Sequence, residues 1–255
     1  MRRSISSAKR TKRAKALVRG LGAGKNYLVV GSKPWNKRLF EEELRGLPGQ
    51  WTLINSPGNL TLDFVRQFSP RYIFFLHWSW KVPNEIVKQF DCVCFHMTDV
   101  PFGRGGSPLQ NLIVRGHRQT KLTALRMTEE FDAGPVYGKE PLSLEGGAEE
   151  IYLRAGTLSA KMIQEIVREE MKPVAQKGKA IQFKRRTPAE SEVITPGSLE
   201  ELFDFIRMLD AEGYPRAFLQ YSGMRFEFSR PALYDGRIVA DVTITRGVSS
   251  TGTPK

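Results

Sequence analysis

Short apolar runs alternate with segments of helical spacing along most of the chain. Four runs have few polar positions and predict buried strands: YLVV at 27–30, WTLI at 51–54, RYIFFLHW at 71–78 and DCVCF at 91–95. Helical spacing follows each of the first three runs, at 37–44, 60–68 and 83–90. Buried strands that alternate with helices predict an α/β fold, in which a Rossmann-like, mostly parallel sheet has helices on both faces.

The alternation continues to residue 182 and then changes. We expect further helices at 108–116 and 148–171, and further strands at 120–127 and 136–142. A polar, proline-bearing connection begins at residue 183 and leads to a helix at 198–213, a hairpin and a last strand at 238–246. The pattern therefore predicts three regions: a tail at 1–25, a main domain at 26–182 and a small C-terminal α+β unit at 183–255.

The positive charge of the chain is concentrated at its beginning. The formal net charge is +12, and residues 1–40 hold twelve Lys or Arg and no acid. The other 27 basic residues balance the 27 acids, so residues 41–255 are neutral. We interpret the basic tail as a solvated segment. An arm that contacts RNA or a membrane, or an organelle transit peptide, is also compatible with its composition.

Other features favour a protein of the cytoplasm without a metal. No apolar run reaches the roughly 18 residues of a membrane helix, and the start of the chain lacks the apolar core of a secretory signal. Cys92 and Cys94 lie two residues apart in a predicted strand, where they cannot form a disulfide, which favours a reduced, cytoplasmic setting. With three histidines and no second cysteine pair, we expect no metal site.

The stretch CVCFHMTDVPFGRGGSPLQN, at 92–111, joins a predicted strand to a glycine-rich loop. Ligands of open parallel sheets bind beyond the carboxyl ends of the strands, and His96 lies at such an end. Gly103, Gly105 and Gly106 lack side chains, so backbone N–H groups can approach a ligand closely. Arg104 adds a guanidinium group with five hydrogen-bond donors. We therefore expect a ligand site at this loop.

Together with EEFDAGPVY at 129–137, this loop resembles the folate-dependent formyltransferase family, which includes methionyl-tRNA formyltransferases and nucleotide-sugar N-formyltransferases. The resemblance covers about residues 26–175. The positions that match the family's pattern are His96, Thr98, Pro101, Arg104, Gly105, Pro108, Gln110, Gly116, Thr120 and Thr123, followed by Asp132 and Gly134 of an Asp-x-Gly loop.

The resemblance implies that residues 26–182 form a catalytic domain that transfers a formyl group from N10-formyltetrahydrofolate to a primary amine. His96 would take the proton of the amine or bind the formyl oxygen, and Asp132 would orient the imidazole. The residues implied at the folate are Trp78, Trp80, Pro101, Arg104, Gly105, Glu129 and Phe131.

Cys94 departs from the family's pattern, which has an asparagine two residues before the histidine. The amide donates a hydrogen bond to the formyl oxygen, whereas a thiol is a weak donor. Loss of one such donor costs about 10²- to 10³-fold in rate. The activity would then be slow, altered or absent, unless N–H groups of the glycine loop or a protonated His96 replace the amide. Cys94 acting as a nucleophile is a further alternative.

The sequence leaves the acceptor open. The site pattern and the short C-terminal unit favour an amino sugar on a nucleotide carrier. The basic tail favours initiator methionyl-tRNA, and Cys94 allows a formyltransferase-like protein that binds folate without catalysis. The oligomeric state is also open, with a homodimer through the final β-rich unit as one arrangement.

Overall fold

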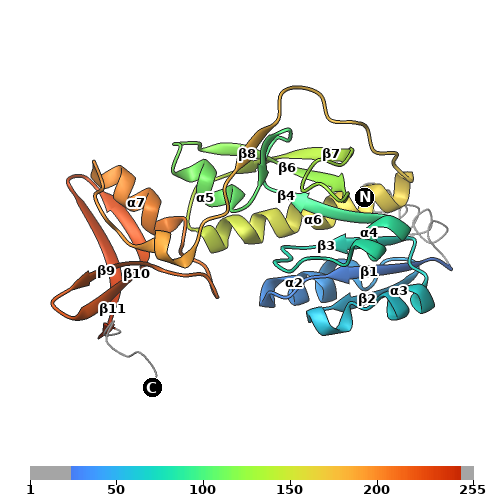
Figure 1. The fold of residues 1–255 in the computed structure, drawn as a ribbon, viewed down its shortest axis with the longest axis horizontal. Coiled ribbons are helices and arrows are strands. Elements are labelled where there is room, and N and C mark those ends of the chain that lie inside the picture. The colour runs from blue at the N-terminus through green and yellow to red at the C-terminus, as the bar shows by residue number, and fades with distance from the viewer. Residues whose placement is uncertain (1–23, 248–255) are drawn as a thin grey trace, which may run out of the picture.

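A six-stranded sheet forms the centre of the structure, a computed structural model that describes residues 24–247 (Figure 1). The strands lie in the order β2-β1-β3-β4-β6-β7. Their bounds are Asn26–Val30 for β1, Gln50–Ile54 for β2, Tyr72–Phe75 for β3, Cys92–His96 for β4, Gln119–Arg126 for β6 and Val136–Ser143 for β7. Strands β1 to β4 run parallel, and β6 is antiparallel to both of its neighbours. The predicted mostly parallel sheet is confirmed.

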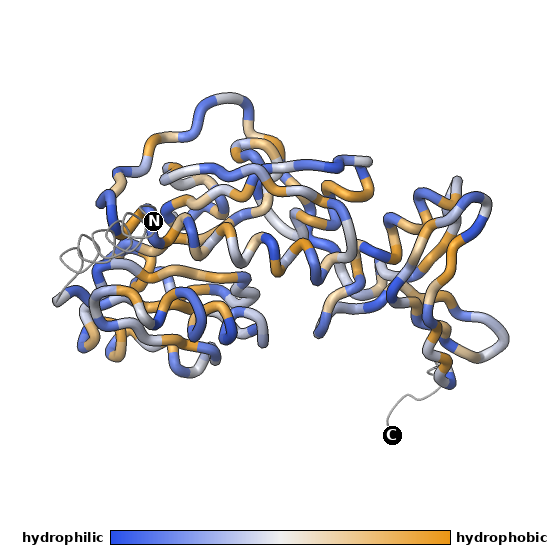
Figure 2. Tube along the Cα trace, turned by 180° about the vertical axis from the view of Figure 1, so that it is seen from behind, coloured by the Kyte–Doolittle hydropathy of each residue, from blue (hydrophilic) through white to orange (hydrophobic). Residues whose placement is uncertain are grey.

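Helices cover both faces of this sheet, as the buried strands predicted. Their bounds are Pro34–Leu39 for α2, which continues as a π-helix at Phe40–Leu44, Leu62–Phe68 for α3, Asn84–Gln89 for α4, Pro108–Ile113 for α5 and Ala148–Glu169 for α6. Consecutive strand residues point to opposite faces. Tyr27 and Val29 pack into the apolar layer that contains α6, while Leu28 and Val30 pack into the layer that contains α3 and α4. Figure 2 shows orange, hydrophobic stretches along the strands between these layers.

One pair of strands was not predicted. The loop after His96 contains β5, Phe102–Gly105, which pairs in parallel with β8, Ile181–Phe183. A glycine-rich segment has low strand propensity, and its partner lies far away in the sequence, so no local pattern indicates this pairing. Strand β8 spans the boundary between residues 182 and 183 that the composition indicated, and it joins the connection to the glycine loop.

Some predicted elements end earlier than their patterns indicated. The strand expected at 71–78 stops at Phe75, and His77 adopts a left-handed backbone with φ of 51°. The helix expected at 198–213 is α7, Leu199–Arg207, and it is followed by turns. Hydrophobic spacing continues through such reversals, because a turn of a few residues can keep the same side chains buried.

The C-terminal unit packs against the end of the main domain. It contains α7 and a three-stranded antiparallel sheet in the order β11-β10-β9, with bounds Ala217–Tyr221 for β9, Met224–Tyr234 for β10 and Arg237–Arg246 for β11 (Figure 1). Arg207 is 1% exposed and donates to the carbonyls of Leu144 at 2.6 Å and Gly146 at 2.8 Å. Its Nε donates to Asp204 at 2.6 Å, which compensates the buried charge. The interface therefore fixes the unit with charge-assisted hydrogen bonds.

Between residues 24 and 247, no helix is long and apolar enough to cross a bilayer. The predicted basic tail lies mostly outside the described residues; Lys25, at its end, forms an ion pair with Glu170.

Candidate active site

His96 is the last residue of β4 and is 8% exposed. Its Nε2 lies 2.7 Å from the carbonyl oxygen of Gly103, and the hydroxyl of Thr98 donates to the same oxygen at 3.2 Å. Because a carbonyl only accepts, Nε2 must be the protonated nitrogen of the neutral ring. The lone pair is therefore on Nδ1, which lies 3.5 Å from Oδ1 of Asp132.

Asp132 is held in place by the glycine loop. Its other carboxylate oxygen, Oδ2, accepts a hydrogen bond from the backbone N–H of Gly105 at 2.9 Å. Its backbone has φ of 54°, a left-handed conformation that aspartate tolerates better than most residues. The carboxylate thus joins β4 and β5, and the structure brings His96 and Asp132 together as the spacing predicted.

Two glycines around this pair cannot be replaced without a clash. A Cβ on Gly105, whose φ is 103°, would lie 2.5 Å from the carbonyl oxygen of Phe183 in β8. A Cβ on Gly134 would lie 1.8 Å from the carbonyl oxygen of Arg126. These positions need glycine because the backbones approach each other closely, which explains the residue type at both matched positions.

Gln176 is a residue of the site region that the sequence analysis missed. Its side-chain amide donates to the carbonyls of Asp132 and Gly134, both at 2.8 Å, and its oxygen accepts from Nε of Arg104 at 3.1 Å. Arg104 also pairs with Glu130 at 3.3 Å. Arg104 therefore fastens the glycine loop to the Asp-x-Gly turn, and no motif in the sequence indicated that Gln176 would complete this link.

Cys94 lies on the same face of β4 as His96, two residues before it, and is half-buried. Burial raises the pKa of its thiol, and the negative charge of Asp132 raises it further. Activated cysteines have the opposite environment, with nearby positive charge. The structure therefore gives no support to Cys94 as a nucleophile.

Aromatic side chains extend from the neighbouring strand end. Trp78 and Trp80 follow β3, and their rings are 4.8 Å apart. Trp80 is 47% exposed, and Phe131, next to Asp132, is 72% exposed. Nε1 of Trp78 is buried and has no hydrogen-bond partner among the described residues. Exposed ring faces and an unsatisfied donor fit a flat, polar heterocycle, so these residues suit the pterin that the resemblance implies.

The remaining predicted folate contacts have structural partners of their own. Pro101 precedes β5, and its carbonyl accepts from the N–H of Ile181 at 3.0 Å. Glu129 pairs with Lys88 on α4 at 2.9 Å. Their contact with a ligand stays a prediction. A pocket of about 320 Å³ is lined by residues 81–85, which follow Trp80 in the chain.

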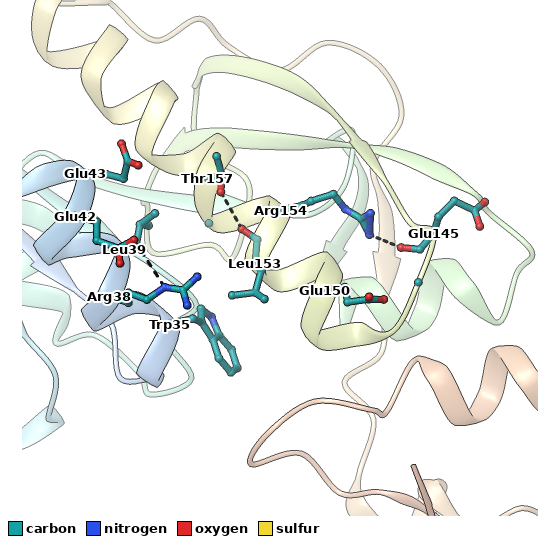
Figure 3. A pocket seen from close by; sticks show the side chains of 12 residues that line it. Trp35, Arg38, Leu39, Glu42, Glu43, Glu145, Glu150, Leu153, Arg154 and Thr157 are labelled. Atoms are coloured by element: carbon teal, nitrogen blue, oxygen red, sulfur yellow. Dashed lines mark hydrogen bonds and ion pairs between the residues drawn. The ribbon is translucent and has the colours of Figure 1, made fainter. Parts of the chain in front are cut away.

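A larger pocket, of about 530 Å³, lies elsewhere, between α2 and α6 (Figure 3). Figure 3 shows Trp35 on one side and Thr157 and Arg154 of α6 on the other. None of the predicted site residues lines it. Within residues 24–247, no three His, Cys, Asp or Glu side chains are grouped closely enough to hold a metal ion.

Comparison with known proteins relates this geometry to a family. A family model described as the C-terminal domain of methionyl-tRNA formyltransferase matches residues 188–245. Methionyl-tRNA formyltransferase of Rickettsia prowazekii (strain Madrid E) is 28% identical over 141 residues, which are 53% of this chain and 42% of that protein. The chain spans about half the length of the curated relatives it matches.

Solved structures share the whole architecture. A 4-N formyltransferase from Francisella tularensis covers 85% of this chain and 96% of its own, with a TM-score of 0.63 and 13% identity, which shows the fold alone. The structure titled methionyl-tRNA formyltransferase from Clostridium thermocellum covers 88% of this chain and 100% of its own, with a TM-score of 0.85 and 44% identity. Because that identity extends over a complete relative, the chain belongs to the formyltransferase family.

Proposed function

We propose that this protein transfers a formyl group from N10-formyltetrahydrofolate to a primary amine. The observation that supports the proposal is the contact between His96 and Asp132, at 3.5 Å, beside a loop of glycines at the end of a central strand. The formyl-folate, when bound, supplies the carbonyl carbon that the amine attacks. The protein must then accept a proton from the amine and stabilise negative charge on the formyl oxygen.

His96 and Asp132 would manage the proton. Nε2 already donates to Gly103, so Nδ1 is the ring atom that can receive the proton of the amine. The imidazolium formed in this way would have Asp132 at its newly protonated nitrogen and Gly103 at the other. The carboxylate stabilises the charged ring, while the hydrogen bond from Nε2 to the Gly103 carbonyl fixes the orientation of the ring before the proton arrives.

The site offers few free hydrogen-bond donors for the formyl oxygen. The N–H of Gly105 is occupied by Asp132, and the N–H of Gly106 donates to Phe183 at 3.2 Å. Two of the backbone donors that the sequence offered as substitutes are therefore already paired. Both N–H groups of the imidazolium are also taken, by Asp132 and Gly103. We infer that the Cys94 thiol supplies the remaining side-chain hydrogen bond to the formyl oxygen, and that transfer is slower than with an amide at this position.

The cofactor would lie between the strand ends. Trp78 and Trp80 would border the ring system on one side and Phe131 on the other, with Nε1 of Trp78 donating to it. Arg104 and Gly105 would contact the cofactor at the entrance of this site with their backbone atoms. The side chain of Arg104 is not free to do so, because it is already bound to Gln176.

For the acceptor, we favour an amino sugar on a nucleotide carrier. The chain is neutral from residue 41 onward, and the described part of its C-terminal unit, up to residue 247, has one α-helix, a short 3-10 helix and a three-stranded sheet, which offer a small surface for a large nucleic acid. Methionyl-tRNA is the second candidate. It is favoured by the name of the Clostridium relative, which is 44% identical, and by the basic segment 1–25.

The experiment is formyl transfer with purified full-length protein. N10-formyltetrahydrofolate is incubated with a panel of nucleotide-linked amino sugars and, separately, with methionyl-tRNA, and both tetrahydrofolate release and formylation of the acceptor are measured. We expect turnover that His96→Gln abolishes and that His117→Gln, an equal change at an exposed turn, leaves intact. Folate binding without turnover of any acceptor would indicate the non-catalytic alternative. Absence of both binding and turnover would refute the proposal.

A further inference from the structure

Tyr214 reaches from the C-terminal unit to the end of β3. It lies between α7 and β9, and its hydroxyl is hydrogen-bonded to Nε2 of His77, a residue 137 positions earlier in the chain. His77 lies two residues after Phe75, the last residue of β3. This bond joins the C-terminal unit to the edge of the sheet at which the candidate site lies.

Burial keeps both partners of this hydrogen bond uncharged. Burial lowers the pKa of His77 to about 4, and the positive charge of Lys33 contributes to the shift. Burial raises the pKa of the Tyr214 hydroxyl. At neutral pH the imidazole is therefore uncharged and the phenol keeps its proton. The contact is therefore a hydrogen bond between two uncharged groups, whichever ring nitrogen of His77 bears the proton.

Packing restricts both rings. The ring of Tyr214 stacks on Tyr152 of α6 with centroids 5.2 Å apart, and Tyr152 meets His77 edge to face at 4.4 Å. Gln110 donates to the Tyr152 hydroxyl at 3.1 Å and to the carbonyl of Met208 at 3.0 Å. The His77 ring is thus enclosed by side chains from α6 and from the C-terminal unit.

The backbone at His77 connects this cluster to the tryptophans. His77 has φ of 51°, a conformation that a side chain with a Cβ disfavours. The reversal ends β3, and it sends Trp78 to the opposite apolar layer, which it shares with Cys94. Trp80 follows at 4.8 Å from Trp78. A residue that holds His77 in this conformation therefore also sets the direction in which both indoles leave the sheet.

We propose that Tyr214 is a positioning residue for Trp78 and Trp80, the two indoles that border the cofactor site. Its hydroxyl holds the His77 turn, and through that turn it fixes Trp78 and Trp80 where they meet the folate ring. The inference rests on the proposed function, because it assigns the two indoles to the cofactor. It makes the C-terminal unit part of the donor site, although no residue of that unit needs to touch the donor.

Tyr214→Phe is the informative substitution, since it removes only the hydroxyl and keeps the stacked ring. Tyr221→Phe is the matched control, because Tyr221 is in the same unit and is 71% exposed. Loss of one buried hydrogen bond should weaken tetrahydrofolate binding by about 5- to 30-fold. The KM for formyl-folate should rise by a similar factor, while kcat at saturation changes by less than about threefold. Tyr221→Phe should leave both unchanged.

His77→Asn tests whether Tyr214 acts through His77. Asparagine tolerates the left-handed backbone, but its shorter side chain cannot place a polar atom where Nε2 lies. If the path is correct, the double variant Tyr214→Phe/His77→Asn should bind tetrahydrofolate no more weakly than the weaker single variant. Losses that multiply would show independent effects and would overturn the inference.

A measurement without ligand separates this inference from the proposed function. The ¹⁵N–¹H indole resonances of Trp78 and Trp80, assigned with Trp78→Phe and Trp80→Phe, report the segment in the free protein. We expect both to shift or broaden in Tyr214→Phe and to stay in place in Tyr221→Phe. Unmoved indoles overturn the inference, even if folate binds. Failure of the native protein to bind tetrahydrofolate contradicts the proposed function, while the indole resonances still decide the role of Tyr214.

Discussion

An Asp132→Asn substitution would remove the charge next to His96 and leave the shape of the site nearly unchanged. The amide oxygen of asparagine can still accept the N–H of Gly105, which now bonds to the carboxylate at 2.9 Å. Asparagine also tolerates the left-handed backbone, with φ of 54°, at this position. The variant should therefore fold normally, and its effect should fall on the imidazolium that forms during transfer.

The magnitude follows from the distance and the burial of the pair. Nδ1 and Oδ1 are 3.5 Å apart, and the two side chains are 9% and 16% exposed. With an effective dielectric constant of about 20, opposite charges at this separation attract by about 5 kcal/mol. In the Asp132→Asn variant, the dipole of the amide and the reorganised solvent restore part of this attraction energy. A net loss of about 2–4 kcal/mol corresponds to a fall in kcat of about 30- to 1,000-fold.

The assay is tetrahydrofolate release at saturating formyl-folate with the acceptor that the native protein formylates. Glu130→Gln is the matched control, because Glu130 is two residues away and its side chain is 69% exposed. The KM for formyl-folate should change little in Asp132→Asn, since the missing interaction is made with the charged imidazole. A kcat within about threefold of the native value would refute the assigned role of Asp132.

Three further predictions concern neighbouring features. Cys94→Asn should raise kcat by up to about 10²-fold, because it restores an amide donor; an unchanged or lower rate would mean that the thiol has a role of its own. Gly105→Ala should lower the free energy of unfolding in urea by about 2–4 kcal/mol, because its Cβ would meet the Phe183 carbonyl, whereas Gly116→Ala, also at positive φ but in open space, should cost about 1–2 kcal/mol. Similar losses at the two glycines would contradict the close approach of β5 and β8. Finally, the pKa of His77 falls from 6.5 to about 4 on folding, so between these pH values the unfolded chain binds a proton that the folded protein does not. Stability should therefore fall as pH drops through this window, by up to about 3 kcal/mol from this residue, and His77→Asn should flatten the fall; equal slopes would exclude the burial of a neutral His77.

Much of the catalytic domain could be predicted because its signals are local. The apolar runs that became β1 to β4 have few polar positions, which only a sheet covered on both faces requires. His96, Gly105 and Asp132 could be selected because a chain that repeats a family's spacing repeats its backbone path. The contact at 3.5 Å between His96 and Asp132 agrees with that expectation.

The tertiary structure alone decided which distant segments complete the site. Strand β8 pairs with the glycine loop, Gln176 links Arg104 to Asp132, and Tyr214 bonds to His77. Each contact joins residues that are far apart in the chain, and its partners have ordinary polar side chains or low strand propensity. Periodicity and turn chemistry describe conformations set by a few neighbouring residues, so they determined the strands of the sheet and its helices. Contacts between distant segments form only where the packed core brings them together, since each must overcome the entropy of closing a long loop, and for this reason the local pattern could not reveal them.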